Sequence, residues 1–159
     1  MKNDIKRLWS EIVEADKRLW VALQAFLAGD RSERLEILRS GLRAELGTAL
    51  QVLGRVPSDE LEDMLPELVQ LAGAVHRHLW QVRTLILSLP KEKLLARIEA
   101  LAEPILASGD EQEYCRFLEM YLQIDGALTE RLAKKAASSN DPGIREAGLS
   151  FLEKLRGNS

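Results

Sequence analysis

Apolar residues recur at helical spacing almost throughout this chain. In residues 3–28 the main row repeats every seven positions, at Ile5, Ile12, Leu19 and Phe26. The residues that flank this row are Leu8, Trp9, Ala15, Ala22 and Leu23. Such spacing gives a helix one apolar face, and this face is broader than the seam of a two-stranded coiled coil. No alternating run of β-branched residues bounded by turns competes with it, so the pattern predicts an all-α fold.

The composition supports the same prediction. Of 159 residues, 46% are hydrophobic, 30% are charged and only 5% are aromatic. This balance supplies a core, and the length is that of one ordinary domain. We therefore expect a single all-α domain over residues 1–159, with a long-helix bundle at 1–108 and shorter helices at 110–156.

Proline, glycine and capping residues divide the chain into six or seven predicted helices. Three long ones are expected to form the bundle, over residues 3–28, 32–54 and 63–89, with a short helical turn at 59–63 before the last. Further helices are expected from Pro90 to about 105, between Asp110 and Asp125, over 126–138, and from Pro142 to 155. Residues 111–138 also fit a single helix. Gly41 and Gly47 mark either a close helix contact or a local irregularity in the second helix.

The C-terminal string LTERLAKKAASSNDPGIREAGLSFLEKL, residues 128–155, joins two amphipathic segments at an Asp-Pro corner. It resembles one HEAT or armadillo-type helical repeat. In that family the Asp-Pro corner turns the chain, and the arginine that follows packs between adjacent repeats. The resemblance assigns these roles to Asp141, Pro142 and Arg145. No second copy occurs at the expected spacing, so it implies a C-terminal helical hairpin packed on a bundle, and not a full solenoid.

Residue types that carry catalysis are sparse. The two histidines, His76 and His78, stand two positions apart on the predicted 63–89 helix, so they should point to opposite faces and not share a metal ion. Cys115 has no disulfide partner in the chain, and a buried thiol is favoured over one activated at a helix start. Neither a GxGxxG nor a GxxxxGK[ST] phosphate loop occurs. We expect no enzyme activity and no cofactor.

An acidic cluster precedes the third long helix, at Asp59, Glu60, Glu62 and Asp63. Carboxylates of this kind could hold a hard cation. The cluster lacks the spacing and the central glycine of an EF-hand loop, and acidic residues stabilise a helix N-terminus. Helix capping is therefore the favoured interpretation, and no metal site is predicted.

The basic residues do not form a concentrated patch. The net charge is −3, from 22 Lys and Arg against 25 Asp and Glu. The basic groups expected to cluster are Arg31, Arg34, Arg39, Arg43, Lys134 and Lys135. A nucleic-acid-binding domain normally carries a strongly basic face, so nucleic acid is disfavoured as a partner. Basic ends and an acidic middle could instead complement a protein partner or a second copy.

The sequence also bears on location. The N-terminus, MKNDIKRLWSEI, is charged and amphipathic and does not resemble a secretory signal. The longest apolar stretch, Leu79 to Leu89, is shorter than the roughly 20 residues that cross a bilayer. We expect a cytoplasmic protein that does not enter a membrane.

Three tryptophans, Trp9, Trp20 and Trp80, remain as candidate contact residues. Trp20 is expected off the main row of its helix, where it fills a second helix interface or anchors a partner. We predict a non-enzymatic protein–protein interaction module, a helical adaptor or scaffold, that binds another protein or a second copy of itself. The predicted partner-binding residues are Trp20, Arg39, Arg43 and Arg145. The alternative is a small-molecule sensor with a cavity lined by Trp80, Val75 and Tyr121.

Overall fold

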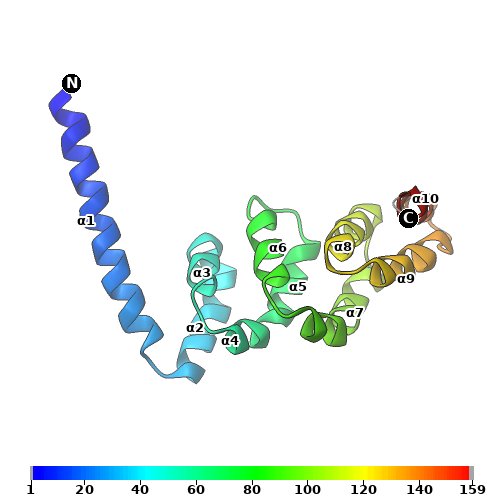
Figure 1. The fold of residues 1–159 in the computed structure, drawn as a ribbon, viewed down its shortest axis with the longest axis horizontal. Helices are drawn as coiled ribbons and strands as arrows, with labels where there is room; N and C mark the ends of the chain where they lie inside the picture. The colour runs from blue at the N-terminus through cyan, green and yellow to red at the C-terminus, as the bar shows by residue number, and fades with distance from the viewer. Residues whose placement is uncertain (1, 158–159) are drawn as a thin grey trace. The chain divides into compact units, whose positions relative to one another are not determined.

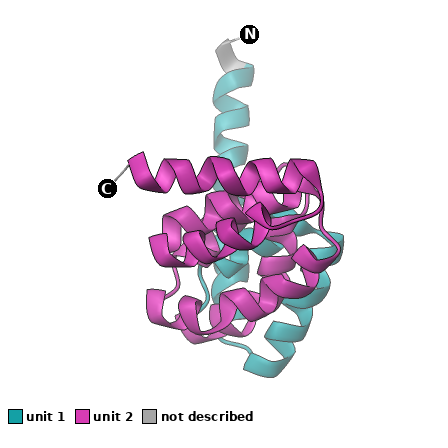
Figure 2. Ribbon diagram, turned by 90° about the vertical axis from the view of Figure 1, so that its right-hand side faces the viewer, with its two compact units in different colours: residues 1–56 teal, residues 57–159 magenta. Residues whose placement is uncertain are grey.

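The computed structural model describes residues 2–157 and shows an all-α protein (Figure 1). Within that span the chain forms ten helices and no strand. In chain order they are α1 (Lys2–Leu27), α2 (Arg31–Ala44), α3 (Leu46–Leu53), α4 (Ser58–Asp63), α5 (Leu65–Gly73), α6 (Leu79–Leu87), α7 (Lys91–Ala107), α8 (Glu111–Ile124), α9 (Gly126–Ala137) and α10 (Pro142–Gly157). The chain divides into two compact units, residues 1–56 and residues 57–159 (Figure 2). The predicted grouping of residues 1–108 against 110–156 stays a prediction.

The all-α prediction is confirmed, but the expected count of six or seven helices is too low. One reason is that the predicted helix over 32–54 is two helices, α2 and α3. The chain bends at Glu45, whose φ of −140° and ψ of 57° are not helical, and whose N–H donates to the Gly41 carbonyl at 2.7 Å. A Cβ on Gly41 would lie 3.3 Å from the Ala49 Cβ. This glycine thus marks both a close helix contact and an irregularity.

The predicted 63–89 helix is also two helices, because α5 ends at Gly73 and α6 begins at Leu79. Side chains cap the broken end. Arg116 of α8 donates from Nε to the Gly73 carbonyl at 2.7 Å, and His76 Nε2 lies 2.9 Å from the Leu71 carbonyl. Helix ends leave carbonyls without an intrahelical partner. Here a side chain from α8 and one from the segment after α5 donate hydrogen bonds to these carbonyls or lie within hydrogen-bond distance of them. The predicted start of this helix at Asp63 is also wrong, since Asp63 is the last residue of α4 and α5 begins at Leu65.

The remaining corners lie where the sequence placed them. Asp30, Asp110, Asp125 and Asp141 each accept a hydrogen bond at 3.0 Å from the backbone N–H three residues later. Such aspartates are strong N-caps, and Glu113 completes a capping box with Asp110. A single helix over 111–138 is excluded, since α8 ends at Ile124 and α9 begins at Gly126.

In the unit formed by residues 57–159, the core lies among α5, α6, α7, α8 and α9. Its largest buried rings, Phe117 and Tyr121, meet edge to face with centroids 6.1 Å apart. Fully buried aliphatic residues around them include Leu68, Ile86 and Ile98. The Tyr121 hydroxyl donates to the Ile98 carbonyl at 3.4 Å, so the buried polar atom has a partner.

The last two helices pack closely against each other. A Cβ on Gly148 of α10 would lie 2.6 Å from the Ala133 carbonyl oxygen and would also clash with the Ala137 backbone nitrogen. Only a residue without a Cβ permits this approach. Helices α9 and α10 therefore form a hairpin, and its likeness to a HEAT repeat stays a prediction.

In the unit formed by residues 1–56, α2 and α3 pack together, and α1, which precedes them, is a single long helix (Figure 1). The small core is built from Leu35, Leu38, Leu42, Ala49, Leu50 and Leu53. Arg34 is buried and donates from Nη1 to the Leu27 and Gly29 carbonyls at 3.0 and 2.7 Å. It caps the C-terminal end of α1, so this end of the helix is fixed within the unit.

Candidate functional site

The apolar face of α1 lies open to solvent. We call its exposed members the α1 stripe, which comprises Ile5, Leu8, Trp9, Ile12, Leu19 and Trp20. Ile5 is 70% exposed, Trp9 is 65% exposed and Ile12 is 59% exposed. Scattered apolar residues on a surface are ordinary, but a contiguous apolar patch is not.

Length explains why the stripe is uncovered within its own unit. At about 1.5 Å per residue, α1 has 26 residues and spans about 39 Å, whereas α3 has 8 residues and spans about 12 Å. The short hairpin of α2 and α3 therefore covers only the C-terminal end of α1. There Leu23 is buried, and Phe26 and Leu27 are half-buried.

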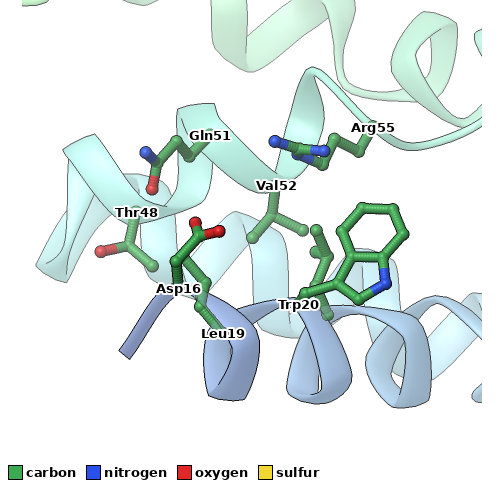
Figure 3. Close-up of a pocket in the computed structure, with 8 residues that line it drawn as sticks. Asp16, Leu19, Trp20, Thr48, Gln51, Val52 and Arg55 are labelled. Carbon is green, nitrogen blue, oxygen red and sulfur yellow. The ribbon is translucent and has the colours of Figure 1, made fainter. Parts of the chain in front are cut away.

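Where the stripe meets α3 it forms the wall of a pocket of about 240 Å³ (Figure 3). Helix α1 contributes Asp16, Leu19, Trp20 and Leu23, and α3 with the residues after it contributes Thr48, Gln51, Val52 and Arg55. The Arg55 guanidinium carbon lies 5.8 Å from the centroid of the Trp20 ring, within the range of a cation–π contact. The pocket thus has an apolar wall, one aromatic ring and a polar rim.

Charged residues occupy the part of the α1 surface that the stripe leaves free. Arg7 Nη1 pairs with Glu11 Oε1 at 2.7 Å, and Lys17 Nζ pairs with Glu14 Oε1 at 2.8 Å. All four side chains are mostly exposed, so each pair contributes little to the stability of the helix.

The structure brings few of the sequence-predicted contact residues together. Trp20 lines one pocket with Leu19 and Leu23, and its predicted role as a partner anchor stays a prediction. Arg39 and Arg43 lie on α2 and are not among the residues that line this pocket. Arg145 belongs to the other unit and donates from Nη1 to the Ser139 carbonyl at 2.9 Å, which closes its own turn.

Sequence reasoning missed the N-terminal two thirds of the stripe as a surface. Ile5, Trp9 and Ile12 repeat like core residues, and periodicity cannot show that no helix of the same unit covers them. The sequence did carry one indication that the neighbouring helix is short. The helix predicted over 32–54 contains two glycines, and the chain bends shortly after the first of them, Gly41.

The histidines are placed differently from the prediction. His76 lies in the segment between α5 and α6, and His78 is the N-cap of α6, so neither is inside a helix. The backbone N–H of His78 donates to His76 Nδ1 at 3.2 Å, while His78 Nδ1 lies 2.6 Å from Gln81 Oε1. Both imidazole rings therefore make contacts within hydrogen-bond distance at the connection between α5 and α6. Across residues 2–157 we find no group of three or more His, Cys, Asp or Glu that could hold a metal ion.

Cys115 is half-buried on α8. Burial raises the pKa of its thiol, and the nearby Glu111 and Glu119 carboxylates raise the pKa further. A raised pKa disfavours the thiolate form, and the thiolate is the nucleophile.

The other charged clusters are engaged within the fold. Glu62 pairs with Lys93, and its backbone carbonyl accepts from Arg97 Nη1 at 3.1 Å. Lys134 pairs with Glu130 at 2.6 Å and Lys135 with Glu103 at 2.7 Å. Arg34 is buried and caps α1, so it does not contribute to a basic surface.

The residues predicted to line a sensor cavity differ in exposure. Val75 and Trp80 are 78% and 76% exposed, whereas Tyr121 is buried. A cavity of about 310 Å³ does include Trp80, and its other lining residues are Leu79, Arg83, Thr84, Leu87 and Gln123.

Comparison with known proteins identifies no relative, since no family model, curated protein or solved structure matches this chain. Within the described residues, no helix combines the length and the hydropathy needed to span a bilayer.

Proposed function

We propose that this protein is a non-enzymatic protein–protein interaction module, a helical adaptor, and that the α1 stripe is its docking surface. The observation that carries this proposal is the exposure of six large apolar residues along one face of a single helix. Burying such a face in a complex is favourable at about 25 cal/mol per Å² of apolar surface.

The chemistry of the stripe suits a protein partner. Trp9 and Trp20 supply large, rigid contact surfaces, and tryptophan is among the residues that dominate binding energy at interfaces. The pocket beside Trp20 gives the otherwise convex helix a concave feature for a partner side chain. A charged border around an apolar centre is the usual anatomy of an interface.

Two aspartate substitutions on α1 test the proposal. Ile12→Asp places a charge in the stripe, whereas Val21→Asp places the same charge at an exposed apolar position on another face of the helix. Val21 is 68% exposed and Ile12 is 59% exposed, so neither change removes a core residue. Each variant is purified from its own host under gentle conditions and examined by native mass spectrometry.

We expect a discrete complex for the wild type and for Val21→Asp, and no complex for Ile12→Asp. The helical circular dichroism of both variants should equal that of the wild type. A complex that survives Ile12→Asp, or a wild type that is a bare monomer, contradicts it.

A second candidate function is small-molecule sensing, favoured by the cavity around Trp80. Its volume of about 310 Å³ is at the lower end of the range for ligand sites, and Arg83 supplies a cationic group beside an exposed ring. A ligand that binds there should raise the melting temperature with increasing concentration, and Trp80→Ala should abolish that shift. A thermal-shift screen that stays flat across metabolite classes argues against this function.

A further inference from the structure

We infer that the partner of the α1 stripe is the α1 stripe of a second copy of this chain, and that the two helices pair antiparallel. This inference rests on the proposed function and names its partner. The seven-residue repeat of α1, the signs of the charges beside it and the position of the pocket all fit such a pair.

The repeat of α1 is that of a helix which pairs with another helix. Ile5, Ile12 and Leu19 occupy one heptad position, and Leu8, Ala15 and Ala22 occupy the position three residues later. Each of these side chains except the two alanines belongs to the exposed stripe. An antiparallel pair joins the two rows, so that Leu8 faces Leu19 of the other copy and Ile12 faces Ala15. The alanines leave room for the larger residues opposite.

Charges beside the repeat select the antiparallel direction. Glu11 and Arg18 stand immediately before the Ile12 and Leu19 positions, on the same border of the stripe. In the antiparallel register given above, Glu11 of each copy faces Arg18 of the other, which makes two opposite-charge pairs. A parallel, in-register pair would instead place Glu11 beside Asp16 of the other copy. Like charges in that position destabilise pairing, so the sequence disfavours the parallel arrangement.

The pocket accounts for the second border of the stripe. The same antiparallel register brings Trp9 of one copy beside Asp16 of the other, next to Leu19 and Trp20. Together with Leu23, these three residues form the α1 wall of the pocket. The indole N–H of Trp9 can donate to the Asp16 carboxylate while its ring covers apolar surface. The stripe is broader than a simple two-helix seam because this edge also meets α3.

A membrane surface fits the same stripe less well. Helices that lie on membranes carry a polar face rich in lysine and arginine. Here the polar surface of α1 carries Glu11 and Glu14 as well as Arg7 and Lys17, and Asp16 lines the pocket together with Leu19 and Trp20. Anionic lipid would repel these carboxylates, whereas a second copy supplies Arg18 and the Trp9 indole for two of them.

Charge reversal on the full chain tests the register. The Glu11→Arg variant and the Arg18→Glu variant each replace two attractions by two repulsions, and we expect each to weaken dimerisation about tenfold in sedimentation equilibrium at low salt. The double variant restores opposite pairs in exchanged positions and should return the dissociation constant to within about threefold of the wild type. Lys17→Glu, a charge reversal on another face of α1, is the control.

Disulfide trapping tests the direction separately, in a Cys115→Ala background. An equimolar mixture of Leu8→Cys and Leu19→Cys chains should give the mixed disulfide, whereas Leu8→Cys alone should stay largely uncrosslinked. Efficient self-crosslinking of Leu8→Cys shows a parallel pair and overturns the inference. So do a double variant that dimerises no better than the single variants, and a chain that is monomeric at every concentration.

The outcomes also separate this inference from the proposed function. A purified chain that stays monomeric but forms a complex with another protein, lost in Ile12→Asp, overturns the second-copy inference alone. Binding to vesicles of mixed neutral and anionic lipid by a monomeric chain, with no protein complex, overturns both.

Discussion

Single residues in this protein set how closely its helices approach. Gly148 allows the α10 backbone to lie against the backbone of α9. At Gly73 of α5, a Cβ would lie 3.1 Å from the side chains of Ile105 and Phe117. The atoms that face Gly148 belong to a helix backbone, whereas those that face Gly73 belong to side chains. Side chains can move by a few tenths of an ångström, but a helix backbone moves only as a unit.

Gly148→Ala is accordingly expected to destabilise the fold strongly. The added methyl group would meet the Ala133 carbonyl oxygen at 2.6 Å, and overpacking of this kind costs about 1–3 kcal/mol. Gly126→Ala is the matched control, since nothing lies within 4 Å of its Cβ position at the start of α9. Urea unfolding should show a lower midpoint for Gly148→Ala only. Equal midpoints for the two variants would contradict the close packing of α9 and α10.

The carboxyl group of Asp125 makes the stability of the folded protein depend on pH. The hydrogen bond from Lys91, 2.8 Å away, and those from the Leu128 and Ala127 backbone lower the pKa of this carboxyl group. A group with a lowered folded pKa stabilises the protein above its unfolded pKa of about 3.9 and loses that contribution as pH falls through the folded value. Stability should therefore fall below about pH 4.

Asp125→Asn should flatten part of that acid decline, because the amide does not titrate. Its side-chain oxygen can still cap α9, so the loss at neutral pH should be modest. Urea unfolding at a series of pH values from neutral to acid measures the effect. An unchanged acid decline in Asp125→Asn would show that other carboxylates dominate it.

At the scale of the elements, sequence reasoning succeeds where a helix end is encoded locally. The aspartates that cap α2, α8, α9 and α10 act on backbone groups three residues away, so the capping pattern could be read from the sequence. The ends of α5 and α2 could not be predicted in the same way. Gly73 receives its cap from Arg116, which is 43 positions away, and periodicity continues across the break.

The remote cap of α5 yields an element-scale prediction. Arg116→Ala removes the 2.7 Å hydrogen bond to the Gly73 carbonyl, and hydrogen bonds from charged groups contribute about 1.5–3 kcal/mol. Arg131→Ala removes an exposed pair with Glu99 and should cost less than about 1 kcal/mol. Thermal unfolding of both variants provides the comparison. A larger loss in Arg131→Ala would show that the end of α5 does not depend on Arg116.

At the scale of the whole molecule, the candidate site arises from a mismatch of lengths. The sequence predicts that α1 is amphipathic, because Ile5, Ile12 and Leu19 repeat every seven positions. It does not reveal exposure, since that depends on whether a second helix of equal length lies alongside. Trp20 could be proposed from its residue type, whereas Arg55 could not, because only the packing of α3 brings it near the ring.

Hydrogen–deuterium exchange along α1 tests the central claim most directly. The backbone amides of a single helix with an uncovered face exchange rapidly by local opening. We expect the amides of residues 5–20 to become protected in the native complex or at high protein concentration, and to exchange fast after dilution or in Ile12→Asp. Protection that appears elsewhere, while residues 5–20 exchange equally fast in every state, would contradict the assignment of the α1 stripe as the docking surface.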